Sequence, residues 1–274
     1  MSEKTYTERN VSPDHRDILV VGCGKMAGAL LSQWITTENT FTALDPSAGG
    51  VPKGVRHVGS AEELAADETF DVIVVGLKPQ LVEDILPGFN GRLKDGGYVF
   101  SMAAGMSASR ISGTLGGART VRIMPNLPAA IGSGISALYA GEGVSSEHRT
   151  HAESLALTSG KVQWVDDEDA IDRFTAIAGS GPGYVFELLR AYTEAATGLG
   201  FSREEARKMV LATVIGTARM AEEDERSLTD LRNAVTSPNG TTAAGLDALA
   251  GAGSADAMFE SALKTAYARA VELR

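Results

Sequence analysis

The sequence predicts an α/β protein in which a doubly wound, mainly parallel β-sheet is followed by an all-α region. Two patterns support this expectation. Between residues 17 and 166, short apolar and β-branched runs alternate with helical stretches, which is typical of a parallel sheet covered on both faces. After the acidic run at 166–169, long alanine-rich segments take over. We therefore divide the chain into a polar N-terminal tail (1–16), an α/β domain (17–166) and a helical domain (167–274).

Seven strands and one early crossover helix are expected in the α/β domain. The residues from Ser60 to Glu63 have the spacing of a capping box, so we expect a helix to begin there and to connect two strands. The strands are short runs of β-branched or apolar residues, expected at 18–21, 41–44, 72–76, 98–101, 120–123, 135–138 and 162–165.

A glycine-rich turn follows the first expected strand, in the sequence GCGKMAG at 22–28. Gly22 allows a tight turn, Gly24 lets the backbone approach a pyrophosphate at the next helix N-terminus, and Ala27 is small enough for close helix packing. Asp45 ends the second strand about 20 residues further on, where a carboxylate can accept ribose hydroxyls. These features predict a dinucleotide-binding domain of the Rossmann type.

Composition and charge exclude several function classes. The net charge of −10 opposes binding to nucleic acid. The longest apolar runs, such as 72–77, are too short to span a bilayer, so we expect no membrane partner and a cytoplasmic protein. Cys23 is the only cysteine, which agrees with a reducing compartment. It is either a redox switch beside the cofactor or, as we favour, a small residue filling the turn.

The histidines do not predict a metal site. None of His15, His57, His148 and His151 has carboxylates or cysteines at metal-ligand spacing. His148 and His151 share a polar stretch, so we expect both to be solvated.

The helical domain is expected to associate with a second copy. Pro182 suits the first turn of a helix that runs towards Gly198, and Ser202 opens a second helix with capping-box spacing. The stretch 209–220 of that second helix is apolar on nearly every face, and 258–271 carries a narrower apolar stripe. A small domain cannot surround such a helix alone, so we infer a homodimer.

A polar loop at 235–246 separates two helical segments of this domain. Its hydroxyls and backbone N–H groups converge on a small volume at a helix N-terminus, which favours binding of a carboxylate. The alternative is an elaborate helix cap. The loop around Ser180, at 179–182, carries the same two interpretations.

Five segments resemble the signature segments of the pyrroline-5-carboxylate reductase family. They are RIMPNLPA at 122–129, AGSGPGYVF at 178–186, VTSPNGTT at 235–242, LKPQ at 77–80 and SMAAG at 101–105, so the resemblance covers nearly the whole chain beyond Arg16. It implies hydride transfer from NAD(P)H to the cyclic imine 1-pyrroline-5-carboxylate, which yields L-proline in the last step of proline biosynthesis. It also implies a helical domain that forms a homodimer or a ring of dimers.

The resemblance also implies roles for individual residues. Thr242 matches the donor near the imine nitrogen, and Glu225 matches an acid near the same nitrogen, although the acidic run 222–225 could simply be solvated. The residues expected to bind the cofactor are Gly22, Gly24, Lys25, Met26, Ala27, Asp45, Lys78, Pro79, Ala103, Ala104, Gly105 and Asn126. Those expected to bind the substrate are Ser180, Ser237, Pro238, Asn239, Gly240 and Thr241.

The chain departs from the family pattern at four positions. Lys25 stands where Asn is usual, Leu127 where Thr is usual, Gly183 where Ala is usual, and Asn239 where a glycine pair begins. Because Asn tolerates left-handed backbone, Asn239 is compatible with the loop. The negative charge of Asp45 predicts that NADH is used at least as well as NADPH.

Two alternative functions are compatible with the expected architecture. A related imine reductase or β-hydroxyacid dehydrogenase would share the architecture but relies on a catalytic lysine or a differently placed acid. Lys208, the only lysine between Lys161 and Lys264, has a solvent-facing sequence context. A non-catalytic nucleotide sensor would have no use for the polar loop at 237–242.

Overall fold

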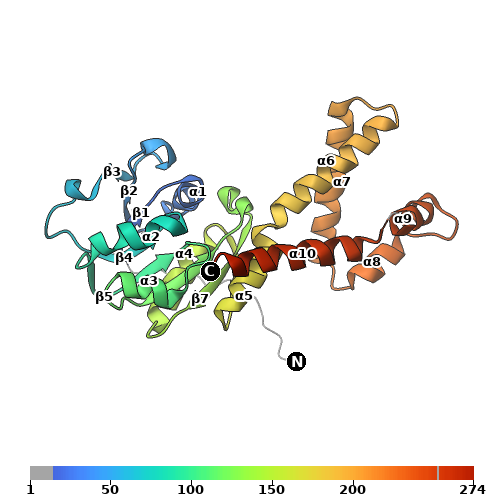
Figure 1. Cartoon of the computed structure of the whole chain (residues 1–274). Helices are drawn as coiled ribbons and strands as arrows, with labels where there is room; N and C mark the ends of the chain where they lie inside the picture. The colour runs from blue at the N-terminus through green and yellow to red at the C-terminus, as the bar shows by residue number, and fades with distance from the viewer. Residues whose placement is uncertain (1–14, 252) are drawn as a thin grey trace. The chain divides into compact units, whose positions relative to one another are not determined.

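The computed structural model describes residues 15–251 and 253–274, and the chain forms two compact units (Figure 1). Unit 1 comprises the chain up to Gly179 together with Tyr267–Arg274, and unit 2 comprises Ser180–Ala266. Most of the expected polar tail lies outside the described residues. Within the described part of the chain, no helix is both long and apolar enough to cross a membrane.

Unit 1 is built on one eight-stranded sheet with the strand order β3-β2-β1-β4-β5-β6-β7-β8. Every neighbouring pair is parallel except β6 and β7. The strand order reverses direction between β1 and β4, which creates a crevice at the carboxyl ends of the strands. The strands are β1 (Asp17–Val21), β2 (Thr40–Leu44), β3 (Arg56–Val58), β4 (Phe70–Val75), β5 (Leu93–Ser101), β6 (Thr120–Met124), β7 (Gly134–Ala140) and β8 (Gly160–Trp164).

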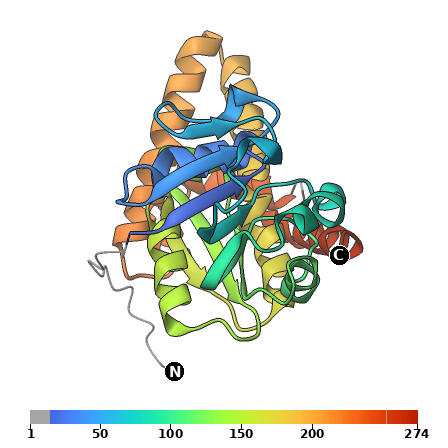
Figure 2. The same cartoon turned by 90° about the vertical axis from the view of Figure 1, so that its left-hand side faces the viewer.

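Helices cover both faces of this sheet (Figure 2). On one face, Trp34 of α1 (Lys25–Trp34) and Leu155 of α4 (Ser146–Leu157) pack with Phe100 in a fully buried cluster. On the other, Val82 of α2 (Pro79–Ile85) and Ile111 of α3 (Ala108–Thr114) are equally buried. The predicted doubly wound, mainly parallel architecture is confirmed. Short 3₁₀ turns complete the unit at Ala48–Gly50, Ala61–Glu63, Leu86–Phe89 and Leu127–Ile131.

The expected crossover helix at Ser60 is wrong. Only the 3₁₀ turn Ala61–Glu63 forms, and the Ser60 side chain makes no capping hydrogen bond. The Glu63 carboxylate instead accepts the N–H of Gly59 at 3.0 Å. The seven predicted strands are present, but the edge strand β3 was not predicted from its polar sequence.

The expectation that His148 and His151 are solvated is also wrong, because both are 5% exposed. His148 completes the capping box of α4 and bonds through Nε2 to the Gly96 carbonyl at 2.8 Å. His151 Nδ1 lies 2.9 Å from the hydroxyl of Tyr98. The two residues are one turn apart on the face of α4 that is buried against the sheet.

The region after the sheet is helical, as predicted. Pro182 stands in the first turn of its helix, and Ser202 and Glu205 form both capping-box hydrogen bonds. In unit 1 lies α5 (Glu168–Phe174), followed by the π-helical turn Thr175–Gly179. The remaining helices are α6 (Gly181–Gly198), α7 (Arg203–Glu223), α8 (Leu228–Ala234), α9 (Thr241–Gly251) and α10 (Ala255–Glu272), whose last residues join unit 1.

Candidate active site

The carboxyl edge of the parallel strands gathers the residues expected to bind the cofactor. Strand β1 ends at Val21, β4 at Val75, β5 at Ser101 and β6 at Met124. The loops that follow these strands carry the glycine turn and other residues that the sequence predicts to bind the cofactor. Because neighbouring parallel strands end at the same edge, one crevice can present all four loops to a single ligand.

The glycine turn leaves the start of α1 open. Gly22 has a φ of 84°, a conformation that suits glycine, and its N–H donates to the Leu44 carbonyl of β2 at 2.8 Å. Gly24 is the N-cap of α1, and no side chain caps the helix. The first N–H groups of α1 are therefore available to an anion, and the helix dipole favours one there.

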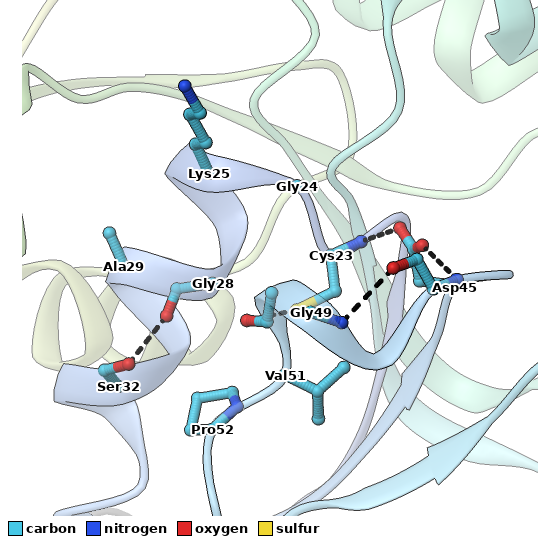
Figure 3. A pocket seen from close by; sticks show the side chains of 12 residues that line it. Cys23, Gly24, Lys25, Gly28, Ala29, Ser32, Asp45, Gly49, Val51 and Pro52 are labelled. Atoms are coloured by element: carbon cyan, nitrogen blue, oxygen red, sulfur yellow. Dashed lines mark hydrogen bonds between the residues drawn. The ribbon is translucent and has the colours of Figure 1, made fainter.

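Asp45 stands at the end of β2 with both carboxylate oxygens hydrogen-bonded. Oδ2 accepts the Cys23 N–H at 2.8 Å, and Oδ1 accepts the Ser47 N–H at 2.9 Å (Figure 3). These two donors orient the carboxylate towards the glycine turn and not away from it. Lys25 points away from this group of bonds in the same view.

The turn Ala48–Gly50 packs directly on the glycine turn and on α1. A Cβ on Gly28 would overlap the carbonyl oxygen of Gly50, and a Cβ on Gly50 would overlap that of Cys23. Only glycine allows these backbones to approach so closely. Sequence reasoning did not assign this turn to the site, although the consecutive glycines after the second strand were a usable signal.

A cavity of about 610 Å³ lies at this place, with Gly24, Lys25, Asp45, Ser47 and Gly49 among its lining residues. A Cβ built on Gly24 meets nothing within 4 Å, so the turn has free space in front of it. A pyrophosphate requires uncapped helix N–H groups with free space in front of them, and the adjoining ribose requires an oriented carboxylate. The residues present thus fit a dinucleotide.

Cys23 is buried, and its thiol donates to the Gly50 carbonyl at 3.3 Å. Burial, with the nearby Asp45 charge adding to it, raises the pKa of the thiol to about 11. A protonated, buried thiol reacts slowly with oxidants. This favours the interpretation of Cys23 as a small packing residue of the turn.

The other loops at this edge also carry expected cofactor residues. Lys78 is the N-cap of α2 and Pro79 its first residue. After β5, Ala104 is exposed at the turn while Ala103 and Gly105 are buried. After β6, the Asn126 side-chain oxygen accepts the Ile135 N–H at 2.9 Å, so this part of the amide holds the loop against β7.

The polar loop between α8 and α9 lies in unit 2. Ser237 and Thr242 are exposed, and the Gly240 N–H donates to the Ser237 carbonyl at 3.0 Å, closing the turn. Asn239 has a φ of 60° and is the only described residue other than glycine with a positive φ. Asn at this position therefore adopts the left-handed conformation of the turn before α9.

Two further expected site residues also lie in unit 2. Ser180 is the N-cap of α6, and its side chain makes no capping hydrogen bond. Glu225 is exposed between α7 and α8. Its neighbour Asp224 is held by Arg226, whose hydrogen bonds lower the pKa of Asp224 to about 2. Glu225 thus differs from Asp224, which is hydrogen-bonded to Arg226.

Comparison with known proteins decides the family. The pyrroline-5-carboxylate reductase of Pseudomonas aeruginosa is 38% identical over 266 residues, which cover 93% of this chain and 96% of that protein. This chain belongs to the pyrroline-5-carboxylate reductase family. The relative in Vibrio alginolyticus is 33% identical over 95% of this chain and 98% of its own length. The structure of the Coxiella burnetii pyrroline-5-carboxylate reductase has a TM-score of 0.85 at 33% identity, covering 94% of this chain and 98% of that one.

Two family models match different parts of this chain. The model described as pyrroline-5-carboxylate reductase dimerisation matches residues 168–273, and the one described as NADP oxidoreductase, coenzyme F420-dependent, matches residues 17–105. The resemblance found in the signature segments and the expected NAD(P)H cofactor are both confirmed. The match to a dimerisation domain also indicates self-association.

Proposed function

We propose that this chain reduces 1-pyrroline-5-carboxylate to L-proline with NAD(P)H, in the last step of proline biosynthesis. Family membership over nearly the whole chain is the observation that carries the proposal. Bound NAD(P)H supplies the hydride, which adds to the imine carbon while the imine nitrogen holds a proton. The protein has to orient the two reactants at contact distance and to exclude water.

The glycine turn and Asp45 serve the cofactor in this proposal. The N–H groups at the start of α1 bind the pyrophosphate, and Asp45 accepts hydrogen bonds from the adenine ribose. Lys78, Pro79, Ala103, Ala104, Gly105 and Asn126 complete the binding surface along the same sheet edge.

The polar loop of unit 2 serves the substrate. Residues 237–241 present backbone N–H groups and hydroxyls to the substrate carboxylate, with Ser180 as a further contact. The hydroxyl of Thr242 donates a hydrogen bond towards the imine nitrogen. Because a threonine hydroxyl is a weak acid, it orients and polarises the imine, and the proton arrives on the substrate or through water. Glu225 stabilises the protonated nitrogen.

We further propose that the chain acts in the cytoplasm as a homodimer or a ring of dimers. Large apolar side chains on α7 support the association: Met209 is 41% exposed, Ile215 50% and Met220 62% in the single chain. Exposed apolar residues grouped on one helix are typical of a protein interface.

A steady-state assay that follows nicotinamide absorbance tests the proposed function. We expect turnover with 1-pyrroline-5-carboxylate and at most weak turnover with 1-pyrroline, which lacks the carboxylate. Equal turnover of both imines would favour a general imine reductase, and turnover of a β-hydroxyacid would favour a dehydrogenase. Dinucleotide binding without any turnover would indicate a sensor.

A further inference from the structure

Two acidic side chains of α5 hold the end of α10. Asp172 Oδ2 accepts the Nε–H of Arg274 at 2.5 Å. Asp169 Oδ1 accepts a second N–H of Arg274 at 2.6 Å and the hydroxyl of Tyr267 at 2.8 Å. We refer to Asp169, Asp172, Tyr267 and Arg274 as the C-terminal clamp. All four residues belong to unit 1.

The clamp depends on Arg274. Asp172 is 4% exposed, and within the described residues Arg274 is the only cation that pairs with it. Hydrogen bonds from Tyr267 and Arg274 lower the pKa of Asp169, which also pairs with Arg173. Asp169 therefore keeps a second cation when Arg274 is removed, whereas Asp172 is left as a buried charge without a partner.

The clamped turn packs on the loop that follows β5. A Cβ on Gly105 would overlap the carbonyl oxygen of Leu273, the residue before Arg274. Gly105 is buried and has a φ of 71°, so the two backbones meet without a side chain between them. Figures 1 and 2 both show the C-terminal end of the chain beside α3, which begins directly after this loop.

The two ends of the same loop are fixed by other bonds. The Ala103 N–H donates to Ser101 Oγ at 3.2 Å, and the Ala108 N–H donates to the Glu168 carboxylate at 2.7 Å. The same Glu168 oxygen accepts a hydrogen bond from Arg122 at 3.0 Å. Gly105 lies between these two fixed points, and the backbone of Leu273 contacts it there.

We propose that Arg274 is a positioning residue for the cofactor. By fixing the last turn of α10 on α5, it keeps Leu273 against Gly105, and so holds residues 103–105 in the shape that binds the dinucleotide. In this proposal Arg274 acts through Leu273 and not by contact with cofactor or substrate. The proposal rests on the proposed function only in taking this loop as part of the dinucleotide site.

The test measures dinucleotide binding to the full-length protein by calorimetry, alongside steady-state kinetics. Arg274→Met keeps the aliphatic part of the side chain and removes the charge. The double variant Asp172→Asn with Arg274→Met also removes the buried carboxylate charge, so it should fold even where the single variant does not. We expect both to raise the Kd for NADH and NADPH about tenfold, while kcat at saturating cofactor and KM for the imine change less than about twofold.

Two further variants show whether the effect on the Kd is specific to the charge of Arg274. Arg269 lies on α10, and Arg269→Met removes its exposed ion pair with Glu272, so this variant should leave the Kd unchanged. Arg274→Lys keeps the charge and should restore part of the affinity. If the Arg274 variants lose thermal stability but bind dinucleotide with the wild-type Kd, the clamp is purely structural and the proposal is wrong. Wild-type protein that binds dinucleotide without reducing the imine would refute the proposed substrate, and the Kd values would still decide the role of Arg274.

Discussion

The carboxylate of Asp45 accepts the backbone N–H of Cys23 at 2.8 Å, so the acid at the end of β2 also braces the glycine turn at the end of β1. Its other oxygen accepts the Ser47 N–H at 2.9 Å. A carboxylate oxygen has two lone pairs, so each can still accept a ribose hydroxyl. The negative charge therefore lies, with a fixed orientation, at the wall of the cavity beside the glycine turn.

This arrangement predicts the dinucleotide preference. A 2′-phosphate would have to lie beside the Asp45 charge, so we expect kcat/KM with NADH to be at least as high as with NADPH. Asp45→Asn preserves the shape and removes the charge, and should raise the NADPH-to-NADH ratio of kcat/KM about tenfold. Asp67→Asn, at an exposed carboxylate outside the site, should leave the ratio unchanged. Wild-type protein that favours NADPH by more than tenfold would contradict this prediction.

The exposed apolar side chains of α7 predict a change in assembly. Ile215→Glu places a charge where we expect the partner subunit to bury an apolar group, so sedimentation velocity should show the dimer dissociating at micromolar concentration. Lys208→Ala removes an exposed ion pair with Glu204 on the same helix and should leave the sedimentation coefficient unchanged. A wild-type protein that is monomeric and active at this concentration would show that α7 is not an interface.

The buried His151 predicts a loss of stability in acid. Burial, assisted by the nearby Arg16 charge, lowers the pKa of His151 to about 4 from 6.5. Between these two values the unfolded chain binds the proton and the folded protein does not, so the free energy of unfolding falls as pH drops from about 6.5 to 4. The fall reaches about 3 kcal/mol from this group.

Denaturant unfolding at several pH values measures this effect. His151→Gln should flatten the pH dependence over that window, because the titrating group is gone. His15→Gln, at a histidine whose side chain is 57% exposed, provides the matched control and should keep the wild-type slope. An unchanged slope in His151→Gln would assign the acid sensitivity to other groups.

The strands and the starts of α6 and α7 could be predicted from the sequence because their signals are local. Short continuous apolar runs and the Ser202 capping box depend on neighbours a few residues away. The predictions failed for two reasons. His148 and His151 are buried because Gly96 and Tyr98 of the distant strand β5 provide their partners. At Ser60 the reason is local, because the Glu63 carboxylate accepts the Gly59 N–H and only a single 3₁₀ turn forms.

The same distinction holds for the candidate site. Gly22, Gly24 and Asp45 carry a local fingerprint, so the NAD(P)H cofactor could be predicted from these residues. The contacts of Gly28 with Gly50 and of Gly105 with Leu273 join segments far apart in the chain, and nothing in the spacing of these glycines reveals their partners.

The conformation of Asn239 predicts which substitutions its loop tolerates. With a φ of 60°, Asn239→Gly should keep both stability and activity, since glycine adopts this conformation without strain. Asn239→Val should destabilise the loop by about 1–2 kcal/mol, because a β-branched side chain clashes in left-handed backbone. Steady-state kinetics should show this as a raised KM for the imine with little change in the cofactor KM. Equal KM values for the Val and Gly variants would show that the loop does not bind the substrate.

The last prediction concerns the hydroxyl of Thr242, which is exposed near the start of α9 beside the Asn239–Gly240 turn. Thr242→Val preserves the shape of the side chain and removes the donor. If this hydroxyl polarises the imine nitrogen, kcat should fall about 10²-fold, as expected for the loss of a positioned donor, while the Kd of the cofactor stays the same. Thr242→Ser should retain most of the activity.

Glu225→Gln tests whether the Glu225 carboxylate, and not the Thr242 hydroxyl, stabilises the protonated imine. If the carboxylate stabilises the protonated imine, the pH profile of kcat/KM should shift in Glu225→Gln but not in Thr242→Ser. An unchanged profile would make Glu225 a solvated residue of the turn between α7 and α8. Wild-type turnover by Thr242→Val would show that the hydroxyl takes no part in the reduction, and that the proton comes from solvent or is already on the substrate.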